Sequence, residues 1–398
     1  MYDVVVIGAR CAGSSTAMLL AQRGYSVLAV DRATFPSDTV STHIVKRPGV
    51  RQLEAWGLLE DVLATGSPPI PRVVVDVGDF PLSGRAPPAD GVPMVAPRRT
   101  VLDELLVEAA EAAGAEVREG FAVRSLLEED GRVVGIEGQQ KGGTRETIRA
   151  RVVVGADGKN SLVARTVGAP TYDDVAPLAF YYYTYWRDLP VDALETYWRH
   201  HRFVLGIPTN DDLTCLVVGR PIADLRSFSA DVERNYHDSL APAPHLQDAV
   251  RDRQPVERFV GTAVPNYFRR PYGPGWALVG DAGLCMDPLF GHGISDAFCD
   301  AELLADAIDA GLEGETPLQE ALQGYEAARN DRKADDYEHN SKLARMEGWD
   351  TPPFPQLRAA LRDNPDEADR WAGTIALSVD RDDFYASSYV REAMAVQK

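Results

Sequence analysis

The stretch DVVVIGARCAGSSTAMLLAQRGYSVLAVD, residues 3–31, decides how the rest of the chain is organised. Its apolar, β-branched residues 4–7 predict a strand that is buried on both faces. The glycine turn at residues 8–13 opens a segment with apolar side chains at helical spacing, and Gly24 ends that segment. A second apolar strand, residues 27–30, follows. This order predicts a strand–helix–strand unit.

The turn before this helix carries the residues that an adenine dinucleotide needs. Gly8 permits a tight turn, Gly13 permits close contact of helix and strand, and Asp31 stands where a ribose needs an acceptor. The free amides and the dipole of the helix start favour a pyrophosphate. Arg10 replaces the middle glycine of the GxGxxG pattern, so close approach of the phosphates requires that its side chain point away or supply positive charge.

Length and composition restrict the class of protein. A chain of 398 residues predicts roughly two or three interlocked domains with room for a large cofactor. The apolar content of 45% and the charged content of 25% are typical of a soluble globular protein. The net charge of -19 disfavours nucleic acid and anionic membranes as partners. Because the first strand begins at residue 2, we expect no leader peptide and a cytoplasmic location.

The cysteines do not indicate a metal or disulfide framework. Cys11, Cys215, Cys285 and Cys299 show neither CxxC spacing nor clustering. We therefore expect four reduced thiols and no metal site.

Periodicity and composition predict an α/β protein of interleaved parts. Residues 1–168 and 270–312 are predicted to form a discontinuous Rossmann-like domain with a parallel sheet, including an antiparallel excursion. Residues 169–269 are predicted to form an antiparallel-sheet substrate domain, since aromatic side chains crowd into residues 180–186. Residues 313–398 are predicted to be a helical C-terminal segment.

Three short apolar strands end in glycine–acid turns. After the turn at Gly8 come Asp157-Gly158 and Gly280-Asp281. All three can lie at the carboxyl edge of one sheet, where open α/β folds bind ligands. An extended FAD needs such widely spaced supports, because its ribityl chain and ring lie far from its adenine. The amides of a helix that begins near Gly293 favour the negative charge that reduction places on a flavin.

Together these motifs resemble those of the FAD-dependent aromatic hydroxylase family typified by p-hydroxybenzoate hydroxylase, and of the branch of its superfamily that includes geranylgeranyl reductases. The resemblance covers about residues 2–310. It implies noncovalent FAD, with Asp281 on the ribityl chain and residues 288–294 beside the isoalloxazine ring. The predicted cofactor-binding residues are Gly8, Ala12, Gly13, Asp31, Arg32, Arg47, Arg99 or its neighbour Arg98, Asp157, Gly158, Gly280, Asp281, Pro288, Gly291, Gly293 and Ile294.

Several reactions are compatible with this cofactor. The resemblance favours an NAD(P)H-consuming monooxygenase, in which FAD activates O₂ as a flavin hydroperoxide, kept from water, that hydroxylates or oxidises a small aromatic or polyketide-like substrate. The alternative is a reductase that saturates isoprenoid C=C bonds. That enzyme would need a long apolar tunnel, whereas the predicted substrate domain is rich in Tyr and Trp with polar neighbours. The choice between NADH and NADPH stays open, as does the oligomeric state.

Two further functions compete with these: a halogenase and a flavin-binding protein without turnover. A flavin-dependent halogenase is disfavoured because its WxWxIP stretch is missing, with Gly206-Ile-Pro208 the nearest approach. Moreover, no lysine stands between Lys46 and Lys141, where halogenases place their catalytic lysine. A flavin-binding regulatory protein without turnover would not oxidise NADH.

No catalytic acid or base stands out, because in this chemistry the flavin oxidises and the protein positions and desolvates the substrate. Alternation along a strand would send about half of the aromatic side chains of residues 180–186 toward a pocket. The candidates for a proton-transferring role are His43, Tyr183, Tyr185, Arg187, His201 and His292.

Overall fold

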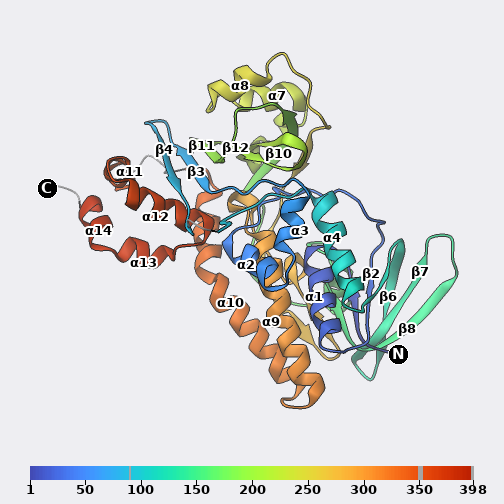
Figure 1. Ribbon diagram of the computed structural model, residues 1–398. Coiled ribbons are helices and arrows are strands. Elements are labelled where there is room, and N and C mark those ends of the chain that lie inside the picture. The colour runs from blue at the N-terminus through green and yellow to red at the C-terminus, as the bar shows by residue number, and fades with distance from the viewer. Residues whose placement is uncertain (89–90, 348–352, 396–398) are drawn as a thin grey trace.

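The computed structural model describes residues 1–88, 91–347 and 353–395. A parallel-sheet unit forms one half of the molecule, an antiparallel sheet lies above it, and the last helices lie to one side (Figure 1). Residues 89–90 of the predicted Rossmann-like domain lie outside the described residues. So do residues 348–352 and 396–398 of the predicted helical segment.

The first strand lies in the middle of the parallel sheet. β1 (Tyr2–Ile7) pairs with β2 (Val27–Val30) on one side and with β8 (Arg145–Gly155) on the other, both in parallel. The sheet continues through β5 (Glu116–Arg118) beyond β2, and through β17 (Trp276–Leu278) and β16 (Tyr272–Gly273) beyond β8. The predicted strand–helix–strand unit is confirmed by this pairing.

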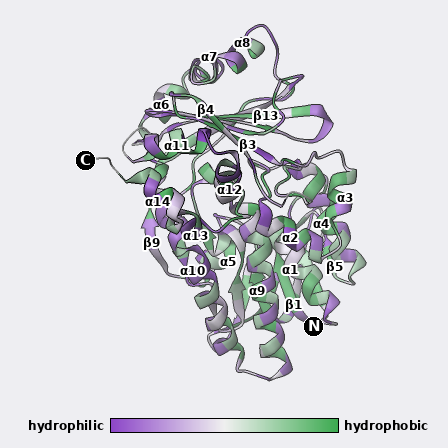
Figure 2. Cartoon of the chain, turned by 60° about the vertical axis from the view of Figure 1, so that its left-hand side comes forward, coloured by the Kyte–Doolittle hydropathy of each residue, from purple (hydrophilic) through white to green (hydrophobic). Residues whose placement is uncertain are grey.

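Two different layers cover the two faces of this sheet. Helices α1 (Cys11–Gln22), α4 (Arg99–Ala112) and α9 (Gly293–Glu313) bury Val4 and Val6 on one face. The predicted antiparallel excursion, β6 (Phe121–Glu129) and β7 (Arg132–Gln140), buries Val5 and Ile7 on the other, together with α5 (Leu162–Thr166). Burial on both sides explains why the strands are apolar throughout. Hydrophobic colours fill these central elements (Figure 2).

The second sheet has seven strands in the order β14-β10-β13-β12-β11-β3-β4. All adjacent pairs are antiparallel except β11 and β3. Their bounds are β14 (Val260–Thr262), β10 (Ala179–Arg187), β13 (Leu213–Pro221), β12 (Arg202–Pro208), β11 (Leu194–Arg199), β3 (Arg72–Asp76) and β4 (Pro81–Arg85). β3 and β4 fall within the predicted range 1–168, so that boundary is corrected: this hairpin belongs to the second sheet, because its apolar side chains are buried there against β11 and the C-terminal helices.

The two faces of β10 have different neighbours. Tyr181, Tyr183 and Tyr185 point to the side of the parallel-sheet unit, whereas Phe180 and Trp186 pack against helices on the outer side. This is the alternation that the aromatic segment predicted. The outer helices, α6 (Leu225–Phe228), α7 (Val232–Ser239) and α8 (Pro244–Val250), were not expected from the sequence.

The remaining elements join these units. A small sheet is formed by β9 (Thr171–Val175), β15 (Asn266–Arg269) and β18 (Leu284–Cys285), and α2 (Arg47–Ala55) and α3 (Leu59–Ala64) flank the parallel unit. α10 (Leu318–Leu343) packs along α9. The last helices are α11 (Phe354–Arg362), α12 (Pro365–Ala376), α13 (Arg381–Ala386) and α14 (Ser388–Met394).

Helix α12 lies directly on β4. A Cβ atom on Gly84 would be 2.2 Å from the carbonyl oxygen of Ala368, so this contact requires glycine. Ala372 and Ala376 of α12 share a hydrophobic cluster with the tyrosines of β10. Helix α12 therefore packs against the second sheet and the hydrophobic cluster of its tyrosines. None of the helices in the described ranges has the length and apolarity needed to cross a bilayer.

Candidate functional site

The three glycine–acid turns line one cavity of about 880 Å³ between the parallel sheet and the antiparallel sheet. Tyr181, Tyr183 and Val217 of the antiparallel sheet form part of its opposite wall. The predicted cofactor residues that line it are Gly8, Ala12, Asp31, Arg32, Arg99, Asp157, Gly158, Gly280, Asp281, Pro288, Gly291, Gly293 and Ile294. The structure thus brings together segments that lie far apart in the sequence.

At the first turn, main chain packs against main chain. Gly8 has a φ of +102°, and a Cβ atom there would lie 2.4 Å from the carbonyl oxygen of Ala156. A Cβ atom on Gly13 would lie 1.7 Å from the carbonyl oxygen of Gly8. Gly13 does not line the cavity. It lets helix α1 approach the sheet, so that the helix start faces the cavity.

Asp31 supports this turn while also facing the cavity. Its Oδ2 accepts a hydrogen bond from the Ala9 amide at 2.8 Å, and its Oδ1 accepts one from the Ala33 amide at 2.8 Å. Each carboxylate oxygen has a second lone pair, which leaves acceptor capacity for a ligand hydroxyl.

The guanidinium of Arg10 is occupied by protein groups. It donates to Asp103 Oδ2 at 2.5 Å, to the Ser37 carbonyl oxygen at 3.1 Å and to Ser37 Oγ at 2.8 Å. It also lies over the ring of Phe35, 5.4 Å from the ring centroid. Arg10 thus ties the first turn to α4 and to the loop at residue 37, which accounts for its place in the glycine pattern.

Asp103 is a site residue that sequence reasoning missed. It is fully buried and accepts bonds from Arg99 at 2.8 and 3.0 Å in addition to the bond from Arg10. The spacing of Arg99 and Asp103, four residues apart on one helix, was a usable signal. Arg99 lines the cavity, whereas Arg98 pairs with Glu257, so Arg99 is the one of the two predicted arginines that reaches the site.

The second and third turns are joined to each other. The Tyr267 hydroxyl donates to the Asp281 carbonyl oxygen at 2.8 Å and lies 3.2 Å from the Lys159 carbonyl oxygen. Asp157 Oδ2 accepts from the Leu162 amide at 2.6 Å, while its buried Oδ1 has no hydrogen-bond partner among the described residues. The Asp281 side chain lies deep in the protein yet is exposed to the cavity, and burial raises the pKa of its carboxyl group.

The loop from Pro288 to Gly293 carries the last predicted contacts. Gly291 has a φ of +64°, and a Cβ atom on it would lie 2.8 Å from Ile44. His292 lines the cavity, with its Nδ1 3.7 Å from Asp336. Burial, with help from the charges of Lys46 and Lys333, holds the pKa of His292 well below its usual value. Its imidazole is therefore neutral at neutral pH.

The other candidates for proton transfer divide into two groups. Tyr183 lines the cavity, and its hydroxyl accepts from the Ser41 amide at 3.4 Å. His43 is fully buried behind it, with Nε2 2.5 Å from the Tyr185 hydroxyl. Burial lowers the pKa of His43 to about 3, so this ring is also neutral. The contact between His43 and Tyr185 helps to position the tyrosine face of β10, which consists of Tyr181, Tyr183 and Tyr185.

Three predicted residues lie elsewhere. His201 is half-buried, with its Nε2 3.0 Å from Glu347 Oε1, and Arg187 is exposed at the end of β10. Arg47 bonds Glu54 and the Val92 carbonyl oxygen at 2.7 and 3.1 Å and does not line the cavity. The proposed dinucleotide contact of Arg47 therefore has no support from this geometry.

Lys46 is buried beside the cavity loop and connects it to α12. Its Nζ donates to the Ile375 carbonyl oxygen at 2.6 Å and lies 5.9 Å from the ring centroid of Phe290. This carbonyl belongs to the last turn of α12, where backbone acceptors have no partner within the helix. Burial lowers the pKa of Lys46 to about 7, with the Lys333 charge acting in the same direction.

We expect the stability of the protein relative to its Lys46→Met variant to rise with pH above 7. In that range the unfolded lysine holds a proton that the folded lysine releases, so raising the pH favours the folded state by up to about 1.4 kcal/mol per pH unit. The measurement is unfolding of both proteins at pH 7, 8 and 9. Lys342→Met, at an exposed lysine, is the control and should follow the parent. If the free energy of unfolding changed with pH by the same amount in the Lys46→Met variant and in the parent, the expectation would be contradicted.

A model of the FAD binding domain family matches residues 1–336. The chain belongs to this family. The predicted Rossmann-like α/β fold with its antiparallel sheet and C-terminal helices is confirmed.

Proteins similar to this FAD-binding protein include enzymes of different activities. Digeranylgeranylglycerophospholipid reductase 2 of Methanopyrus kandleri is 29% identical over 82% of this chain and 81% of its own. Kynurenine 3-monooxygenase of Salinispora tropica is 29% identical over 82% and 76%. The solved structure of the flavin-dependent brominase Bmp2 superposes with a TM-score of 0.81, 22% identity and 98% coverage of both chains, which shows a shared fold. The prediction of an FAD-dependent oxidoreductase is confirmed.

The residues of the cavity fit FAD. At the first turn, the close packing at Gly8 and Gly13 lets the start of α1 face the cavity, where its free amides suit a pyrophosphate. The partnerless Asp157 Oδ1 and the cavity-facing Asp281 are acceptors suited to ribose and ribityl hydroxyls. Individual contacts remain predictions.

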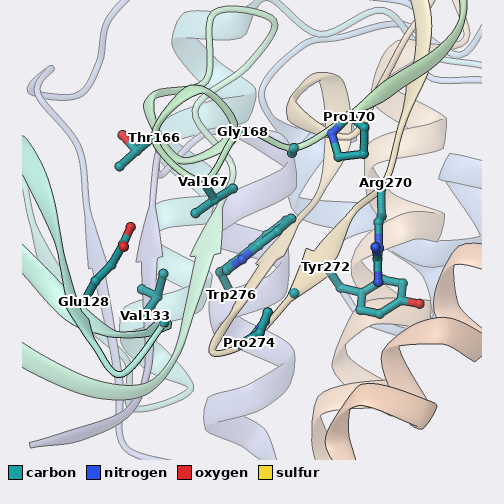
Figure 3. A pocket seen from close by; sticks show the side chains of 13 residues that line it. Glu128, Val133, Thr166, Val167, Gly168, Pro170, Arg270, Tyr272, Pro274 and Trp276 are labelled. Carbon is teal, nitrogen blue, oxygen red and sulfur yellow. The ribbon is translucent and has the colours of Figure 1, made fainter.

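A second pocket, of about 380 Å³, lies at the far end of the parallel sheet (Figure 3). Trp276 and Tyr272 line it beside the main chain of residues 168–170, with Glu128 and Arg270 at its sides. None of the predicted site residues lines this pocket. It is therefore separate from the cofactor cavity. Across the described part of the chain, no group of His, Cys, Asp or Glu side chains has an arrangement that could hold a metal ion.

Proposed function

We propose that this protein is an NAD(P)H-dependent monooxygenase that holds FAD noncovalently and inserts one atom of O₂ into a small aromatic or polyketide-like substrate. Bound FAD would pass electrons from NAD(P)H to O₂. The observation that carries the proposal is the position of the tyrosine face of β10: Tyr181 and Tyr183 line the same cavity as the loop that carries Pro288 and Gly293.

The protein side of this chemistry is a partly apolar wall of the cavity. The tyrosine face shares a hydrophobic cluster with Leu289 of the cavity loop and with Ala372 and Ala376 of α12. Exclusion of water protects a reactive oxygen species from unproductive breakdown. Because His43 and His292 are neutral, these two side chains add no positive charge near the tyrosine face.

Two alternative functions, an isoprenoid reductase and a halogenase, correspond to activities found among the similar proteins. A reductase of isoprenoid double bonds would need a long apolar channel, whereas polar Asp38, Ser41, Thr42 and Asn340 line this cavity. A halogenase would need its catalytic lysine. Lys159 lines the cavity, but it follows the Asp157 turn instead of lying between Lys46 and Lys141, and its Nζ donates to Thr262 Oγ1 of β14, the strand beside β10, at 3.4 Å.

Oxygen labelling separates these reactions. The FAD-loaded enzyme is screened with phenolic compounds for stimulated NADH or NADPH oxidation, and the reaction is then repeated under labelled O₂. We expect one labelled oxygen atom in the product by mass spectrometry. Turnover without O₂ to a product with two added hydrogens would establish the reductase, and a halogenated product in the presence of bromide would establish the halogenase. Absence of NAD(P)H oxidation would favour a non-catalytic flavoprotein.

A further inference from the structure

The residue before Pro288 is a junction between three elements. Asp287 Oδ1 accepts from the Tyr181 hydroxyl of β10 at 2.5 Å and from the Leu289 amide at 3.1 Å. Its amide donates to Asn266 Oδ1 of β15 at 2.7 Å, and its carbonyl oxygen accepts from Asn340 Nδ2 of α10 at 2.8 Å. Asp287 is therefore held rigidly beside the cavity loop.

Two acceptor atoms at this junction have no partner. Asp287 is 4% exposed and Asn340 is 3% exposed, and both line the cavity. Asp287 Oδ2 and Asn340 Oδ1 make no hydrogen bond to any described residue, and neither does the neighbouring donor Asn266 Nδ2, which does not line the cavity. The orientation of the Asn340 amide is defined, since its Nδ2 donates to a carbonyl oxygen. Buried polar atoms in native proteins almost always have partners, so these two acceptors point to a ligand.

The chemistry of the two atoms defines the ligand group. Burial raises the pKa of Asp287 to about 6, so at neutral pH its carboxylate is mainly ionised and accepts hydrogen bonds. The amide oxygen of Asn340 is also an acceptor. A hydroxyl or an amino group donates to such atoms, whereas an ether or a carbonyl oxygen does not.

We propose that Asp287 and Asn340 form a subsite that accepts hydrogen bonds from the hydroxyl or amino group of a phenol or an aniline. This inference rests on the proposed monooxygenase and names its substrate class. The subsite lies between Tyr181 and Pro288, so it orients the aromatic ring of the substrate along the tyrosine face of β10 and beside the cavity loop. Asn266 and Tyr181 act as positioning residues, because they fix the Asp287 backbone and carboxylate.

The test measures binding to the oxidised, FAD-loaded protein by the change in its visible spectrum, without NAD(P)H. The probes are two matched pairs: phenol with anisole, and aniline with N,N-dimethylaniline. We expect the donor of each pair to bind at least about tenfold more tightly, because its analogue leaves the buried acceptors unpaired. Equal affinities within both pairs would overturn the subsite and are the result expected if a buried water alone occupies it.

Asp287→Asn tests the residue directly. The new side chain keeps an oxygen for the Tyr181 and Leu289 bonds but replaces the free acceptor with an NH₂ donor. We expect the preference for phenol over anisole to fall to about twofold or less. Asp252→Asn, the same change at an exposed residue, is the control and should keep the preference. An unchanged preference in Asp287→Asn would overturn the proposal.

A second variant covers the case in which Asp287→Asn does not retain FAD. Asn340→Leu keeps the approximate shape of the side chain and removes the other acceptor, and it should also lower the preference for phenol. The binding test and the oxygen-labelling test fail independently. A phenol preference without labelled product would overturn the monooxygenase alone, whereas labelled product without a donor preference would overturn the subsite alone.

Discussion

Gly13→Ala is expected to abolish formation of the FAD-loaded protein. The added methyl group would lie 1.7 Å from the Gly8 carbonyl oxygen and 3.1 Å from the Ala156 side chain. The first of these neighbours is backbone, so relief requires α1 to move away from the sheet. We expect a loss of stability of about 3 kcal/mol or more, at the upper end of the cost of overpacking. The displaced helix start would also no longer face the pyrophosphate.

Gly324→Ala is the matched control for this variant. Gly324 is exposed in the interior of α10, and no atom lies within 4 Å of the Cβ position. Alanine there should stabilise the protein by up to about 1 kcal/mol through helix propensity. The measurements are the yield of yellow protein and its thermal midpoint. A Gly13→Ala protein with normal FAD content and an unchanged midpoint would contradict the packing of the first turn.

Asp281→Ala is expected to weaken FAD binding about ten- to a hundredfold. The carboxylate faces the cavity, and if it binds the ribityl chain as predicted, its loss would remove charge-assisted hydrogen bonds worth about 1.5–3 kcal/mol. The dissociation constant is measured by titrating the apoprotein with FAD and following flavin fluorescence.

Asp252→Ala, at an exposed position, controls for the general effect of removing a carboxylate. A folded Asp281→Ala protein with unchanged FAD affinity would show that Asp281 serves only as a cap for the turn.

Much of the cofactor unit could be predicted because its signals are local. The run at residues 4–7 requires a doubly buried strand, and Gly8, Gly158 and Gly280 mark turns at the ends of strands. Parallel strands bring those turns to one edge, and the cavity is found there. The alternation of Tyr181 and Tyr183 with Phe180 likewise follows from strand geometry alone.

Other features depend on distant packing and could not be predicted. Residues 73–75 indicate a strand, but nothing local shows that β3 pairs with β11. Helices α6, α7 and α8 are short, and their burial against β10 and β13 decides their structure rather than their own periodicity. The bond from Arg10 to Asp103 likewise requires that α1 and α4 be neighbours.

The position of β3 and β4 has a consequence for the order in which the protein folds during translation. Their partner β11 leaves the ribosome only after the whole of β8, and the parallel sheet still lacks β17 at that time. Neither sheet can close until late in synthesis, so the nascent chain carries an unpaired valine-rich hairpin through much of elongation. An open strand edge of this kind is prone to self-association. The interleaving that builds one cavity between the two sheets therefore leaves this hairpin without its partner strand until β11, near the middle of the chain, has been made.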